Sequence, residues 1–136
     1  MKVFCILVFG STLCGLVHGS QCSLGNVTEP SMQLASYYNS QAATSFEVSC
    51  DRAYNILFKS DNLTGTDGTS YVTNGLYRLK TKMSIWGAGK NIWGVPFSHE
   101  SGHKNKYVIA VQLLDQPFTG VPSGIYRDKI SIYLMF

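Results

Sequence analysis

The sequence has few charged residues, little proline and no long run of one charge. Only 14% of its 136 residues are charged, the formal net charge is +3, and there are 4 prolines. The densest basic spot, Lys104-Asn105-Lys106, is too short to follow a phosphate backbone, which argues against nucleic-acid binding. A hydrophobic content of 45% argues against intrinsic disorder, and the length is that of one domain.

Helical periodicity and the common catalytic motifs are missing as well. After the first twenty residues, no window of eleven or more residues carries apolar side chains at i, i+3, i+4 and i+7, and glycine or proline interrupts most candidates. The chain has no Gly-x-Ser-x-Gly elbow and no glycine-rich loop that could cradle a phosphate. We therefore expect an all-β protein that is not an enzyme and that uses no cofactor.

The first nineteen residues are predicted to be a signal peptide. Lys2 gives a positive start, residues 3–17 are mostly apolar, and Val17-His18-Gly19 suits a signal peptidase. We expect cleavage after Gly19 or Ser20, which leaves one domain over residues 20–136. The alternative is a retained membrane anchor, but the apolar run is shorter than the roughly twenty residues that span a bilayer, which argues against it.

Cysteine is scarce once this leader is removed. Cleavage takes away Cys5 and Cys14 and leaves Cys22 and Cys50. An even pair in an exported protein predicts a disulfide, here closing a loop of about 28 residues worth roughly 3 kcal/mol. The alternative is a lipid-anchored cysteine, but the residues before Cys14 and Cys22 lack the pattern of a lipoprotein signal.

What the chain does have is strand patterning. Strands are predicted at residues 45–50, 53–59, 71–72, 76–83, 107–114 and 129–136, with a degenerate first strand at 31–38 and a tight hairpin at Asn74-Gly75. Residues 107–114 form a continuous apolar run, which predicts a strand buried on both faces. In the last strand, Ile130, Ile132, Leu134 and Phe136 share one face. Six or seven strands of this spacing predict an antiparallel sandwich, with a barrel as the alternative.

One motif matches a metal-binding pattern by its letters. His99-Glu100-Ser101-Gly102-His103 fits H-E-x-x-H, in which a helix brings two zinc-binding histidines onto one face beside a general-base glutamate. Pro96 upstream and the central Ser101-Gly102 oppose a helix here, and no third ligand is evident. We expect an exposed polar loop, and keep a secreted zinc metallohydrolase and adventitious metal binding as alternatives.

Both tryptophans lie in a glycine-rich segment, residues 86–96, predicted to be a long loop or irregular edge. Trp86 and Trp93 could present an exposed aromatic platform to a sugar ring or a hydrophobic surface. Alternatively, both plug the core at the base of the loop. This leaves a stand-alone carbohydrate-binding sandwich as a further alternative function.

Three segments, in order along the chain, resemble a known family. Cys22 is followed by Phe46-Glu47-Val48-Ser49-Cys50, then Leu76-Tyr77-Arg78 leads to Trp86-Gly87-Ala88-Gly89, and Pro122-Ser123-Gly124-Ile125-Tyr126-Arg127-Asp128 precedes the terminal strand. This order resembles the spore coat protein U domain, the subunit family of archaic chaperone–usher pili. The Pro-x-Gly-x-Tyr-x-Asp segment is its most specific part.

The resemblance implies an immunoglobulin-like sandwich that lacks its last strand. In such subunits a periplasmic chaperone, and later a neighbouring subunit, inserts the missing strand, and an outer-membrane usher assembles the pilus on the cell surface. The groove would be lined by Ile130, Ile132, Leu134 and Phe136. A terminal apolar strand left unpaired would be an aggregation site, so strand addition fits its pattern.

The predicted mature chain also lacks a donor segment. Only Ser20-Gln21 precede Cys22, and two residues extend about 7 Å at most, too little to run along a neighbour's groove. We therefore expect a subunit that accepts a strand without donating one, which favours the tip of a pilus. Trp86 and Trp93 would then be candidate contacts with a host or abiotic surface.

Overall fold

The computed structural model describes residues 2–11, 21–117 and 121–136, the first segment as backbone. These residues contain ten strands and no helix, which confirms the all-β class, and so no helix long and apolar enough to cross a membrane is found among them. The strands are β1 (Lys2–Ser11), β2 (Cys22–Gly25), β3 (Ser31–Leu34), β4 (Gln41–Cys50), β5 (Tyr54–Ser60), β6 (Thr69–Asn74), β7 (Tyr77–Gly87), β8 (Phe97–His99), β9 (Gly102–Leu113) and β10 (Ile125–Met135).

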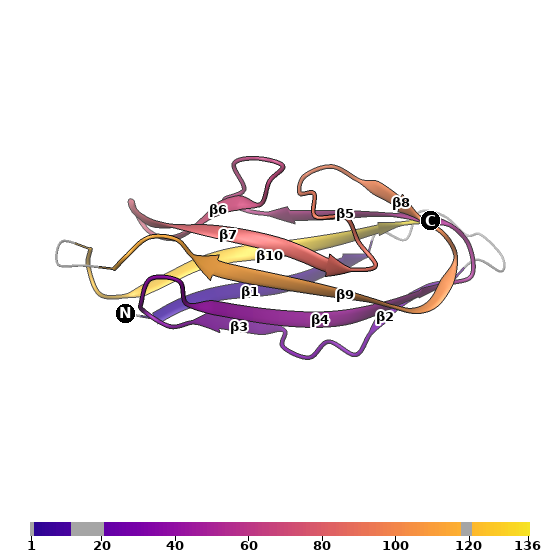
Figure 1. Ribbon diagram of the computed structural model, residues 1–136, viewed down its shortest axis with the longest axis horizontal. Helices are drawn as coiled ribbons and strands as arrows, with labels where there is room; N and C mark the ends of the chain where they lie inside the picture. Colours follow the sequence, from indigo (N-terminus) through magenta and orange to yellow (C-terminus); the bar gives the residue numbers. More distant parts are fainter. Residues whose placement is uncertain (1, 12–20, 118–120) are drawn as a thin grey trace.

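The strands form two layers joined along one hydrogen-bonded path. The order is β2-β4-β9-β7-β6-β10-β1-β3, with β5 also paired to β10 and β8 paired to β5. A single residue pair, Arg127 with Thr73, links β10 to β6, and there the sheet turns from one layer into the other. Figure 1 shows β4, β9 and β7 in front of β10 and β1. Among the described pairings all are antiparallel except that of β1 with β10.

Aromatic residues fill the space between the layers. Phe46 on β4 and Tyr107 on β9 stack at 5.4 Å between ring centroids, and Phe58 on β5 lies about equally far from both, at 6.2 and 6.0 Å. The hydroxyls of Tyr54 and Tyr107 are 2.6 Å apart, so two buried phenols satisfy each other. These contacts from opposite layers make one shared core, as expected of a sandwich.

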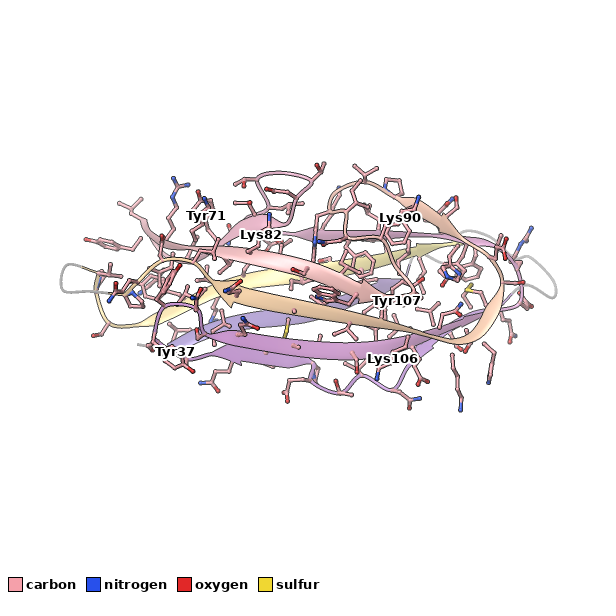
Figure 2. All side chains as sticks on the ribbon, in the orientation of Figure 1. Tyr37, Tyr71, Lys82, Lys90, Lys106 and Tyr107 are labelled. Carbon is pink, nitrogen blue, oxygen red and sulfur yellow. A yellow bond between two sulfur atoms is a disulfide. The ribbon has the colours of Figure 1, made fainter. Side chains whose placement is uncertain are left out.

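The strand at residues 102–113 is buried on one face only, contrary to the prediction for residues 107–114. Tyr107, Ile109, Val111 and Leu113 are buried, whereas the residues between them are only partly covered. Figure 2 shows Lys106 and Tyr107, adjacent on β9, and the first is exposed while the second is buried. The small apolar residues Val108 and Ala110 occupy the outer face, and this produced the misleading continuous run.

The hairpin between β6 and β7 is present but is displaced by one residue. Asn74 pairs with Tyr77, so the turn consists of Gly75 and Leu76, and Gly75 has φ of 61°. Leu76, predicted to begin the next strand, is fully exposed at the tip. The ten strands found in the described residues exceed the predicted six or seven, because β2 and β8 are too short to show periodicity and β1 lies in the predicted leader.

Candidate functional site

The site is a strand position between β10 and β3, which we call the strand slot. One edge of β10 pairs with β5 over residues 130–135, and the other edge pairs with β1 over nearly its whole length. The far edge of β1 pairs with β3. Without β1, hydrogen-bonding edges of both β10 and β3 would be left open in the rear layer, and open edges recruit strands.

The slot is filled here by residues of the predicted leader. β1 runs parallel to β10 from Lys2 beside Ile125 to Ser11 beside Leu134, and antiparallel to β3 from Val3 to Ile6. In the intact chain, this segment is therefore part of the sheet, although the sequence places it outside the domain. The predicted cleavage point after Gly19 or Ser20 lies outside the described residues, so cleavage stays a prediction.

The residues predicted to line the groove lie on the core face of β10. Ile130, Ile132 and Leu134 are 0, 1 and 4% exposed, and Phe136, one residue beyond the strand, is partly buried against the same core. β1 places Leu7, Phe9 and Ser11 beside the first three. The burial agrees with the predicted alternation, whereas a role in accepting a strand stays a prediction.

Four further core-facing residues also border the slot. Sequence reasoning did not assign them to it. Tyr126 and Asp128 precede Ile130 on the same face of β10, and Met32 and Leu34 lie across the slot on β3. The alternation Ser31-Met32-Gln33-Leu34 was the available signal for β3, but four residues make a weak pattern. Tyr126 and Asp128 belong to the Pro-x-Gly-x-Tyr-x-Asp segment, for which the sequence indicated no physical role.

Asp128 is a buried carboxylate at the start of the slot. It is 3% exposed and accepts hydrogen bonds from the Ser70 hydroxyl at 2.8 Å, the Lys129 amide at 2.9 Å and the Asn62 amide at 3.2 Å. Ser60 and Ser70 are also bonded to each other at 2.9 Å. Burial raises the pKa of Asp128, and the hydrogen bonds from Ser70, Ser60 and the two amides oppose that rise. The cluster ties β10 to the ends of β5 and β6.

At the opposite end of β10, the predicted disulfide is present. Cys22 and Cys50 are directly paired residues of β2 and β4, with an S–S distance of 2.01 Å. An open hollow of about 710 Å³ lies beside it and is lined in part by Asp51, His103 and the terminal Phe136. The disulfide fixes β2 at the edge of the front layer, close to where the described chain resumes at Gln21, whose amide bonds to Asp51 at 2.9 Å.

The H-E-x-x-H motif does not have the geometry of a zinc site. His99 ends β8, Gly102 begins β9, and the two residues between them connect the strands without regular structure. The imidazole of His99 stacks on Tyr54 at 5.4 Å, and its Nδ1 lies 2.8 Å from the carbonyl oxygen of Glu100. In the part of the chain whose side chains are described, no three His, Cys, Asp or Glu residues are grouped to hold a metal. The helix that the motif needs is missing from residues 97–103.

The two tryptophans occupy opposite environments. Trp93 is fully buried, its ring 5.8 Å edge-on from Phe58, and its backbone amide bonds to the Thr66 carbonyl at 3.0 Å. Trp86 is 63% exposed on the outer face of β7. The platform interpretation therefore suits Trp86 alone, and the core-plug interpretation is correct for Trp93.

Comparison with known proteins shows the fold. The sequence matches no protein-family model and no curated protein. Among solved structures, it is similar to a chain of the CsuC–CsuE chaperone–tip adhesion subunit pre-assembly complex of archaic chaperone-usher Csu pili from Acinetobacter baumannii, at 16% identity and a TM-score of 0.52 over 86% of this chain. A chain from a chaperone–tip adhesin complex of CFA/I fimbriae biogenesis gives 13% identity and a TM-score of 0.51 over 84% of this chain.

A third structure, the minor tip subunit HdaB of the E. coli Hda pilus, gives 13% identity and a TM-score of 0.44 over 83% of this chain and 80% of that one. The chain spans only 40 and 41% of the first two structures' chains. The first two likenesses therefore show that the described strands adopt a sandwich fold that also occurs in chains of chaperone–adhesin complexes.

Proposed function

We propose that this protein is a non-enzymatic structural or adhesive subunit of a surface pilus, completed by a strand donated from another chain. The observation that carries the proposal is the strand slot, where an N-terminal segment with the composition of a removable leader supplies the strand between β10 and β3. The resemblance to the spore coat protein U domain and the fold shared with chains of chaperone–adhesin complexes support the same interpretation.

The mechanism is strand addition. After export and cleavage, the edges of β10 and β3 would expose unpaired backbone groups beside Ile130, Ile132 and Leu134. A strand from a periplasmic chaperone would satisfy those groups and keep the subunit soluble. An outer-membrane usher would then exchange that strand for one from a neighbouring subunit, which delivers the protein to the cell surface.

Export with and without a chaperone tests the proposal. The full chain is expressed in a bacterium alone or with a periplasmic chaperone of an archaic chaperone–usher system, and the processed protein in the soluble periplasmic fraction is measured. We expect processed protein to accumulate only with the chaperone, and Ile132→Lys, which puts a charge in the slot, to abolish the co-purified complex. Ser131→Lys, on the other face of β10, is the matched control. A processed protein that is a stable monomer alone would contradict the proposal and favour a stand-alone binding module.

A tip position and a surface contact are finer parts of the proposal. Trp86 is the candidate contact because it is 63% exposed, whereas Trp93 is inside the core. Immunogold labelling of pili assembled with the major subunit tests the position. Label confined to pilus ends is expected, and label along the shaft would contradict it.

A further inference from the structure

We infer that Lys2–Ser11 is the donor strand of the unprocessed chain, so that removing this segment is what opens the slot to a strand from elsewhere. The inference rests on the proposed function, because it assumes that the slot is an acceptor. The inference adds three points to the proposed function. It names the segment that first fills the slot, the direction in which that segment runs, and the residue pattern expected of the donor strand that replaces it.

Pairing of β1 is continuous on the β10 side. All ten residues from Lys2 to Ser11 have a partner on β10, without a bulge, and Val3 to Ile6 have partners on β3 as well. A strand that pairs on both edges closes the rear layer completely along residues 31–34. The strand runs parallel to β10, so its last residue, Ser11, lies beside Leu134 near the end of β10.

Alternate residues of β1 are in register with the buried residues of β10. Val3, Cys5, Leu7 and Phe9 stand beside Tyr126, Asp128, Ile130 and Ile132, which are all buried. Large apolar residues are thus in register with the two isoleucines, and a small one is in register with the carboxylate. Burial of apolar area at Ile130 and Ile132 favours this occupant over water.

The remaining residues of β1 are in register with the outward-facing residues of β10. Phe4, Ile6 and Val8 stand beside Arg127, Lys129 and Ser131, residues of β10 that are exposed or partly exposed. A strand with one solvent face normally alternates apolar with polar residues, as β10 does. Apolar residues at every position from 3 to 9 therefore fit a temporary occupant. A replacement donor should keep the apolar residues beside Ile130 and Ile132 and carry polar ones at the alternate positions.

A native cysteine allows the register to be tested in the full chain. Cys5 is directly opposite Met32 in the antiparallel pair with β3, and such residues share a face at disulfide distance. In a Cys14→Ser background with mild oxidant, Met32→Cys should cross-link to Cys5 in nearly all folded chains. Gln33→Cys, opposite Phe4 on the other face, should not cross-link. Folded Met32→Cys protein without the cross-link would overturn the inference.

Amide exchange on the unsubstituted chain gives a second measurement in case Met32→Cys does not fold. Amides of residues 3–6, which have a paired strand on both edges, should be protected about 100-fold or more over the same residues in a free peptide, as paired strand amides are. Exchange at the rate of the free peptide would overturn the inference.

Peptide exchange then separates this inference from the proposed function. A protease site is placed within residues 12–20, the full chain is cut, and labelled peptides of residues 2–11 are offered. The native peptide and a version with Phe4→Thr, Ile6→Thr and Val8→Thr should bind, whereas Leu7→Asp with Phe9→Asp should not. If neither of the first two binds but a chaperone does, the inference fails and the proposed function stands. If both bind and no chaperone or subunit does, the proposed function fails.

Discussion

The hydroxyl of Tyr126 donates a 2.7 Å hydrogen bond to the carbonyl oxygen of Pro122, four residues earlier. The tyrosine is fully buried, so this bond closes the loop that leads into β10 and fixes where the slot-forming strand begins. A buried tyrosine that bonds back to the backbone at the start of a strand is also a feature of immunoglobulin-like sandwiches. A Cβ on Gly124 within this loop would meet the side-chain amide of Asn74, so the Asn74 side chain would have to shift.

Replacing Tyr126 tests how much its hydrogen bond to Pro122 contributes to stability. Tyr126→Phe removes the hydroxyl, keeps the ring and leaves the Pro122 carbonyl without this donor, so we expect a loss of about 1 kcal/mol in the free energy of unfolding. Tyr133→Phe, on the opposite face of β10, is the control and should change stability little. Denaturant unfolding of the intact chain measures both. Equal effects of the two substitutions would show that the hydrogen bond from Tyr126 to Pro122 contributes no specific stability.

Asp128 should give the protein a pH-dependent stability of unusual sign. Burial raises its folded-state pKa above the unfolded value, which is about 3.9 for an aspartate. The folded protein therefore holds the proton more tightly than the unfolded chain. This contribution to stability is fully present below the unfolded pKa and is lost as the pH rises through the raised folded pKa.

The substitution Asp128→Asn isolates that contribution. Asparagine has the same shape and does not titrate, so the stability of the variant relative to the native chain should increase as the pH rises from about 4 through the raised pKa. Asp61→Asn, an exposed neighbour of the cluster, is the control. Urea unfolding of the three proteins at a series of pH values gives the comparison. A stability difference between the Asp128→Asn variant and the native protein that does not change with pH would contradict the raised pKa.

The sequence predicted the parts of the fold that depend on local periodicity. The alternation of Ile130, Ile132 and Leu134 predicted a buried face because every second residue of a strand points to the same side. It could not predict which strand lies beside β10, because pairing partners are set by long-range packing. The polar cluster around Asp128 was also inaccessible to sequence reasoning, since Asn62 and Ser70 approach it from distant positions in the chain.

The leader shows a second limit. A continuous apolar run such as residues 3–9 satisfies the requirements of a signal peptide and of a buried strand equally well. Its parallel register with β10 depends on residues more than 100 positions away. Local sequence thus predicts that the segment is apolar, whereas its pairing with β10 follows only from the whole fold.

The disulfide is expected to stabilise the chain through its loop. Cys22 and Cys50 are 28 positions apart, and closing a loop of that length should be worth about 3 kcal/mol in the chain-entropy model. The double substitution Cys22→Ser, Cys50→Ser should lower the unfolding free energy by this amount and should leave β2 paired with β4. Adding a reductant to the native chain should reproduce the loss. A double variant as stable as the native protein would show that β2 docks without help from the bridge.

The two tryptophans should respond in opposite ways to truncation. Trp93→Ala removes a fully buried ring packed on Phe58, and we expect a loss of about 3–5 kcal/mol because a cavity remains. Trp86→Ala removes an exposed ring and should change stability by no more than about 0.5 kcal/mol. Fluorescence distinguishes them further, because an aqueous quencher should reach Trp86 and not Trp93 in the folded protein. If Trp86 contacts a surface or sugar, Trp86→Ala should abolish attachment while leaving the midpoint of unfolding in place. A lower unfolding midpoint for Trp86→Ala would indicate a structural role and remove it as a contact residue.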